Sequence, residues 1–173
     1  ASVEKGTDGL RLLSLQDALA LASELEVRTS TQITPNSSVL IVGKNIYVDD
    51  GATGLNWDPR ALAVAFSYPG RGSQRTVWIE NGFSVAFRID LARRYGLAGI
   101  AVDSIADDPS APAIWQPLRE YAQAGRVELV LPNSTLLKPT WQVQAGSSEV
   151  GAKGNLIWRA PVQPGGYDIA III

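Results

Sequence analysis

The alternation of apolar and helical segments across residues 76–124 constrains the fold of this chain more than any other feature. The expected order is strand, helix, strand, helix, at residues 76–79, 83–95, 97–102 and 114–124. Gly96 and Gly125 follow the two helical segments, where glycine suits the left-handed conformation that ends a helix. Strands and helices in this order are typical of a βαβ unit. The pattern therefore predicts a parallel sheet or barrel.

The first half of the chain predicts one helix and several short strands. Residues 14–26 place Leu15, Leu19 and Ala22 along one side of a helix, and Ser14 is suited to its N-cap. Residues 61–68 have a composition that a helix would also accept. The alternation of Leu62, Val64, Phe66 and Tyr68 favours a strand. Strands are thus expected at residues 38–43, 45–48 and 61–68.

The character of the chain changes after Gly125. Short β-rich segments, separated by glycine and proline, follow at residues 127–131, 140–145, 155–159 and 167–173. Strands at this spacing predict the start of an antiparallel sandwich. We therefore expect two domains, residues 1–126 and 127–173. Without a partner strand, the apolar run at residues 167–173 would leave an exposed sheet edge prone to aggregation. We therefore expect this chain to be a piece of a longer protein.

Composition excludes several classes of function. The chain is 46% hydrophobic and 18% charged, which favours a folded core over disorder. It has no His and no Cys, so it carries no Ser-His-Asp or Cys-His catalysis, no disulfide and no usual zinc site. A net charge of −2 with scattered Lys and Arg disfavours nucleic-acid binding. No apolar run approaches the roughly 20 residues of a membrane span, and residues 1–10 are too polar for a signal peptide.

We expect no cofactor and no metal. The acidic pairs Asp49-Asp50 and Asp107-Asp108 lack the spaced oxygen ligands of a calcium loop. The glycine-rich segment at residues 70–73 is followed by a strand, whereas a phosphate-binding loop precedes a helix. These segments are interpreted as turns and helix starts.

Residues 75–121 resemble a known enzyme family. The resemblance rests on Trp78-Ile79-Glu80-Asn81-Gly82-Phe83-Ser84-Val85, Arg88, Tyr95-Gly96-Leu97-Ala98-Gly99, Trp115 and Leu118. These residues are similar to the last third of a glycoside hydrolase family 18 barrel, in its chitinase-like and spore-cortex-hydrolase-like branch. The resemblance implies α/β architecture: the C-terminal portion of a (β/α)₈ barrel. Residues 1–74 would form an α+β insertion, and residues 75–125 the last two βα units.

Two departures from the family bear on activity. The family's catalytic Asp-x-x-Asp-x-Asp-x-Glu motif does not occur in the chain. The Trp that closes the sugar site after the eighth strand is replaced by Asp103. The resemblance thus implies that this chain does not catalyse the reaction alone. We favour the interpretation that the chain by itself is not an enzyme. Residues 127–173 resemble an incomplete bacterial Ig-like β-sandwich, on Leu137–Trp141, Trp158–Pro161 and Gly166-Tyr167.

Five residues are candidates for a site. On the family's barrel, Glu80 and Asp103 would end adjacent strands, where two carboxylates can act as acid and base or acid and nucleophile. Helix capping or pairing with an arginine is the favoured alternative. Aromatic faces suit sugar rings, so Trp57, Tyr68 and Trp78 are ligand candidates. Trp78 fits a core position better, Trp57 lies in a polar loop where packing is as good an interpretation, and Tyr68 stays open between the two.

The first hypothesis for function is a non-catalytic module resembling family 18, on an exported or cell-surface protein. It would be surface-attached or would face a glycan such as chitin or peptidoglycan. The second is a structural subunit completed by other chains of an extracellular or membrane-associated assembly. The third is the C-terminal part of an active glycoside hydrolase whose catalytic strand lies upstream.

Overall fold

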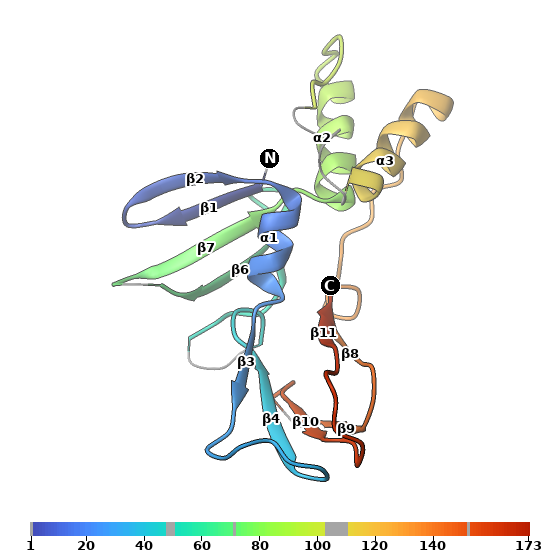
Figure 1. Ribbon diagram of the computed structural model, residues 1–173. Helices are drawn as coiled ribbons and strands as arrows, with labels where there is room; N and C mark the ends of the chain where they lie inside the picture. The colour runs from blue at the N-terminus through green and yellow to red at the C-terminus, as the bar shows by residue number, and fades with distance from the viewer. Residues whose placement is uncertain (1, 48–50, 71, 103–110, 152) are drawn as a thin grey trace.

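The computed structural model describes residues 2–47, 51–70, 72–102, 111–151 and 153–173. Within these residues the chain forms eleven strands and three helices (Figure 1). The strands make a five-stranded, a four-stranded and a two-stranded sheet, which we call sheets A, B and C. The helices lie against and beyond sheet A, and sheets B and C lie together at the other end of the molecule (Figure 1).

Sheet A is antiparallel throughout, in the order β2-β1-β7-β6-β5. Its strands are β1 (Ser2–Gly6), β2 (Gly9–Leu13), β5 (Asn56–Asp58), β6 (Ala63–Pro69) and β7 (Gln74–Ile79). Because side chains alternate along a strand, cross-strand partners share a face. Val64 lies opposite Ile79, and Phe66 opposite Val77. These four buried side chains form the centre of the main core.

Helix α1 (Leu15–Ala22) packs on this face of sheet A. Its buried residues are Leu15, Ala18 and Ala22, which join the main core. The side chain of Ser14 accepts a hydrogen bond from the Asp17 N–H, which satisfies one free donor of the first turn. The predicted helix and its N-cap are confirmed, although the helix is shorter than residues 14–26.

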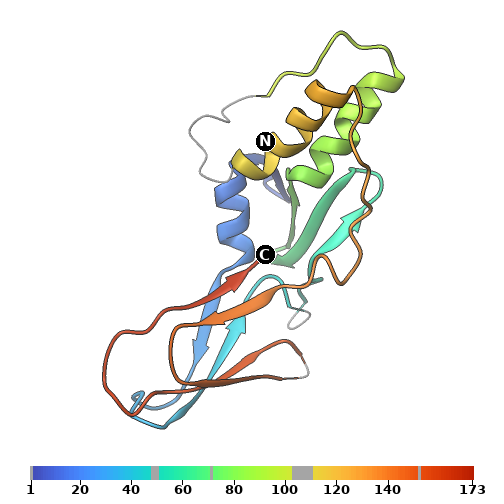
Figure 2. The same cartoon turned by 90° about the vertical axis from the view of Figure 1, so that its right-hand side faces the viewer.

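Helices α2 (Gly82–Arg94) and α3 (Ala111–Ala124) pack side by side at the end of sheet A (Figure 2). The side chain of Asn81 accepts a hydrogen bond from the Ser84 N–H, and Ser84 Oγ accepts one from the Asn81 N–H. This reciprocal pair is a capping box. Gly96 ends α2 with a φ of 63°, as the sequence predicted. None of the described helices combines the length and apolar character needed to cross a membrane.

Sheets B and C enclose a second core. Sheet B has the order β3-β4-β10-β9, and sheet C pairs β11 with β8. The strands are β3 (Leu25–Arg28), β4 (Ser38–Gly43), β8 (Thr140–Val143), β9 (Ser147–Val150), β10 (Leu156–Arg159) and β11 (Ile169–Ile172). Val39, Ile41, Leu156 and Trp158 are buried in this core. The Trp158 indole N–H donates to the Ala145 carbonyl at 2.8 Å, which satisfies its polar atom.

The predicted barrel portion is wrong. Both sides of β7 are occupied by antiparallel neighbours, β1 and β6, so no parallel strand can pair with it. Residues 97–102, expected as the next barrel strand, are not a strand, and Leu97, Ile100 and Val102 are exposed. The sheets are open and mostly antiparallel instead of closed into a (β/α)₈ barrel.

The predicted Ig-like sandwich within residues 127–173 is also wrong. Strand β10 pairs with β4, which lies in the first quarter of the chain. Sheet B is therefore built from both sides of residue 126, and residues 127–131 form no strand. Residues 45–47, within the strand expected at 45–48, form a turn. The division into domains at residue 126 stays a prediction.

Candidate functional site

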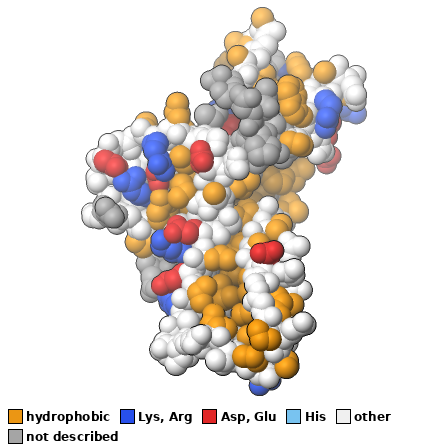
Figure 3. Space-filling model, in the orientation of Figure 1, with side chains coloured by type: hydrophobic (Ala, Val, Ile, Leu, Met, Phe, Trp, Pro, Cys, Tyr) orange, Lys and Arg blue, Asp and Glu red, His pale blue; other side chains and the backbone are white. Residues whose placement is uncertain are grey.

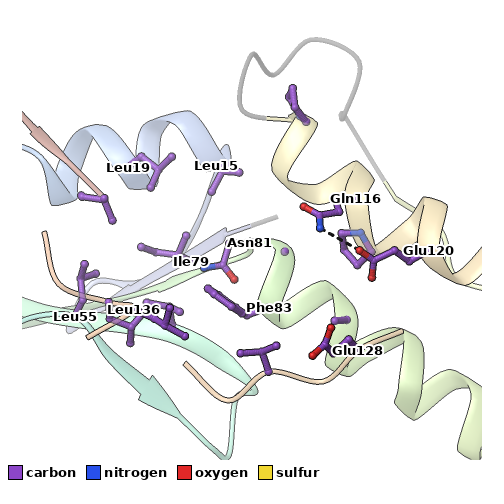
Figure 4. Close-up of a pocket in the computed structure, with 18 residues that line it drawn as sticks. Leu15, Leu19, Leu55, Ile79, Asn81, Phe83, Gln116, Glu120, Glu128 and Leu136 are labelled. Atoms are coloured by element: carbon purple, nitrogen blue, oxygen red, sulfur yellow. Dashed lines mark hydrogen bonds between the residues drawn. The ribbon is translucent and has the colours of Figure 1, made fainter. Parts of the chain in front are cut away.

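A groove of about 600 Å³ lies between α1, sheet A, α2, α3 and the end of β11 (Figure 4). We call it the apolar groove. Segments from across the chain contribute to it, so it exists only in the folded molecule. Its lining consists of Leu15, Leu19, Leu55, Val64, Ile79, Asn81, Gly82, Phe83, Ala86, Pro112, Gln116, Pro117, Glu120, Glu128, Val130, Leu136, Leu137 and Ile173.

The floor of the apolar groove is hydrocarbon. Leu15 and Leu19 descend from successive turns of α1, because residues four apart share a helix face. Val64 and Ile79 rise from directly opposite positions of β6 and β7. Phe83, in the first turn of α2, closes the floor on the side away from α1 (Figure 4). These groups give a ligand apolar contact and no hydrogen-bonding partner.

The other end of the apolar groove is acidic. Glu120 of α3 and Glu128 of the segment after α3 lie on the side opposite the leucines, together with Gln116 (Figure 4). The Gln116 amide donates to Glu120 Oε1 at 3.0 Å, across one helical turn. The lining residues that the structure describes include no Lys or Arg. The groove therefore pairs an apolar floor with a negatively charged end.

A second cavity, of 320 Å³, is lined by an ionic cluster on sheet A. Glu4, only 2% exposed, lies 2.9 Å from the Arg11 guanidinium and 3.4 Å from that of Arg75. The Tyr68 hydroxyl donates to the other oxygen of Glu4, and Arg75 also pairs with Asp8 at 2.6 Å. Figure 3 shows acidic and basic side chains gathered over the β1–β2 hairpin.

The electrostatics of this cluster are balanced within the protein. Partial burial and the hydrogen bond to Glu4 raise the pKa of Tyr68 to about 12. The Arg75 guanidinium lowers the pKa of Asp8 below its usual range. Two carboxylates, Glu4 and Asp8, face two guanidiniums, Arg11 and Arg75, so the charges balance within the cluster. We interpret it as a structural network.

None of the aromatic residues predicted for a site lines the apolar groove. Tyr68 lines the ionic cluster. Trp57 packs on Phe87 with ring centroids 5.1 Å apart, and its buried indole N–H has no hydrogen-bond partner in the described part of the chain. Trp78 lies on the opposite face of sheet A, where its indole N–H donates to Asp58 at 2.8 Å. That hydrogen bond lowers the pKa of Asp58.

The predicted carboxylate pair is described only in part. Glu80 follows β7, and one of its oxygens lies 2.9 Å from the Arg88 guanidinium, the alternative favoured above. Its other oxygen is buried, with no hydrogen-bond partner among the described residues. Asp103 lies outside those residues, as do both acidic pairs considered for calcium, so the role of Glu80 with Asp103 stays a prediction. No described cluster of three or more His, Cys, Asp or Glu is suited to hold a metal ion.

Comparisons of the chain with known protein families, curated proteins and solved structures find no match. The geometry of the apolar groove is therefore the main guide to function. Of its polar residues, sequence reasoning missed Gln116, Glu120 and Glu128. The available signal was the spacing of Gln116 and Glu120, which places two polar groups one turn apart on α3.

Proposed function

We propose that this chain is a non-catalytic binding module whose apolar groove takes a small apolar ligand carrying a cationic group. The observation that carries the proposal is the division of the groove into a hydrocarbon floor and an end with two carboxylates. A ligand with an apolar body and one positive charge matches both halves. It deepens the first sequence hypothesis, a binding module, and changes the class of ligand.

The apolar floor supplies affinity. A cavity of 600 Å³ lies within the size of small-molecule sites, about 300–1,000 Å³. Each Å² of apolar ligand surface buried on the floor contributes about 25 cal/mol before the costs of association. Sugars need dense hydrogen bonding, which Leu15, Val64 and Ile79 do not offer. A glycan would therefore have to bind at a surface other than the apolar groove, and a glycan partner stays a prediction.

The acidic end supplies selectivity. Glu120 and Glu128 favour a cation and repel an anion of the same size, because no described lining residue balances their charge. A primary ammonium suits this end since it carries three N–H donors for carboxylate oxygens.

The test compares three probes of one chain length, decylammonium, decanol and decanoate, by isothermal titration calorimetry below their micelle concentrations. We expect decylammonium to bind most tightly and decanoate most weakly. The double substitution Glu120→Gln and Glu128→Gln should reduce the preference for the cation about tenfold, equivalent to about 1.4 kcal/mol. Equal affinity for the three probes, or no binding, would overturn the proposal.

Two further variants separate the groove from the rest of the surface. Leu136→Lys adds a cation at an exposed position in the lining, so it should weaken decylammonium binding without unfolding the protein. Glu149→Gln is the matched control, because Glu149 is an exposed carboxylate of β9 outside the groove. An equal loss of affinity in the control would place binding elsewhere.

A further inference from the structure

Strand β2 forms one edge of sheet A. One side of β2 pairs with β1 through all five of its residues, and no described strand pairs with its other side. Its leucines, Leu10 and Leu12, are 73% and 75% exposed. An edge of this kind presents unpaired backbone N–H and C=O groups that another strand can use.

The exposed leucines extend an apolar row across the sheet. Leu12 lies opposite Val3, and Val3 lies opposite Trp78 of β7. These side chains share a face because they are directly paired across neighbouring strands. Val3 and Trp78 are half-buried, so the exposed end of the row is at β2. An added strand that brings apolar residues to this face would continue the row.

The central residue of β2 supplies a charge on the opposite face. Arg11 is 61% exposed, and one terminal nitrogen of its guanidinium lies 2.9 Å from Glu4. A guanidinium has five N–H donors, so it can bind a second carboxylate. Strand β1 provides part of this pattern, with Val3 opposite Leu12 and Glu4 opposite Arg11, although Lys5 lies opposite Leu10. The other side of β2 can accept the same pattern.

The far edge of sheet A provides a contrast. Strand β5 has three residues, and Asp58 at its end is held by Trp78. Shortness and charge are common ways in which proteins protect a sheet edge. Strand β2 has five residues, with two exposed leucines and no proline. It lacks the protection that β5 has.

We propose that β2 is a docking edge that takes an extended strand from a partner polypeptide, with an acidic residue between two apolar ones. The acidic residue pairs with Arg11, and the apolar residues cover Leu10 and Leu12. A second copy of this chain is disfavoured by charge. The antiparallel register that sets Leu10 against Leu12 of the other copy also sets Arg11 against Arg11. This inference is independent of the ligand of the apolar groove.

The test uses two acetylated, amidated nine-residue peptides that differ only in their centre, Val-Glu-Val or Val-Lys-Val, with Thr and Ser flanks. Binding is measured by calorimetry, and amide hydrogen exchange reports where the peptide binds. We expect the Val-Glu-Val peptide to bind at least about tenfold more tightly, a difference of about 1.4 kcal/mol, and to slow exchange in β2. Equal affinity of the two peptides, or protection elsewhere in the chain, would overturn the proposal.

Substitutions at the exposed leucines keep the test independent of folding. Leu10→Lys and Leu12→Lys together should abolish peptide binding without changing the melting temperature, because both side chains face solvent. The matched control is Val162→Lys, at a 71% exposed position in a loop. Binding that survives the leucine changes argues against the edge. Dimerisation of the unmodified chain in sedimentation, lost on the same changes, would identify a second copy as occupant and overturn the proposal.

Discussion

One face of sheet A is held together in two different ways. Near α1, Phe66, Val77 and Ile79 are buried and belong to the main hydrophobic core. Two residues further along the same strands, Tyr68 and Arg75 face the buried carboxylate of Glu4. The apolar half of the face is stabilised by burial, which needs no exact geometry. The ionic half contributes stability only where every charge has its partner. The ion pairs therefore fix the position of the β1–β2 hairpin.

The largest expected effect comes from the apolar half. Phe66→Ala should lower the free energy of unfolding by about 3–5 kcal/mol, because it leaves a cavity where the side chain is 0% exposed. Chemical denaturation measures the change. Leu12→Ala on the same sheet should change stability by less than about 0.5 kcal/mol, since Leu12 faces solvent. Similar losses for the two variants would contradict the assignment of the core to the α1 side.

The ionic half should be sensitive in a different way. Arg75→Met keeps most of the side-chain volume but leaves Glu4 with Arg11 and Tyr68 as partners. We expect a loss of stability, because the buried carboxylate of Glu4 loses one of its three partners. Denaturation of this variant is compared with Arg126→Met, which removes an exposed arginine outside the cluster. A neutral or stabilising Arg75→Met would show that the cluster gives specificity without stability.

The smallest effect is a pH dependence at Tyr68. Its folded-state pKa of about 12 exceeds the ordinary value of 10.0, so the folded state favours the neutral phenol. The stability from this group is complete below pH 10 and is lost as the pH rises towards 12. Between pH 8 and 11.5, the measured free energy of unfolding should fall more steeply for the unmodified chain than for Tyr68→Phe. Parallel curves would mean that Tyr68 does not act through its hydroxyl.

Local features of the fold could be predicted from the sequence, whereas the neighbours of each strand could not. The apolar spacing of α1, its Ser14 cap and the glycine after α2 all depend on residues a few positions apart. The barrel prediction is wrong because β1 occupies one side of β7, and in the sequence residues 1–10 are recognisable only as a polar segment. Its alternation is hard to recognise because the inward residues, Ser2 and Glu4, are polar. Ser2 is satisfied by the distant Glu80, and Glu4 by the distant Tyr68 and Arg75 as well as by the nearby Arg11.

The candidate site shows the same limit. The apolar positions of α1 predicted a buried face, which includes Leu15 and Leu19 of the groove. Glu120 and Glu128 line the groove only because α3 and the segment after it return to sheet A. This return cannot be recognised from nearby residues. The predicted aromatic residues were chosen for their chemistry, and the fold distributes them over both faces of sheet A.

The pairing of β4 with β10 has a consequence for how the protein is made. Ile41 lies opposite Leu156, so strands from near the two ends of the chain complete a single sheet. During synthesis from the N-terminus, β4 emerges long before β10, its partner in sheet B, has been made. Pairings so distant in sequence form late and slowly, and unpaired strands attract wrong partners meanwhile. The ribosome must therefore release nearly all of these residues before the second core closes, and this interval is when a chaperone would matter most.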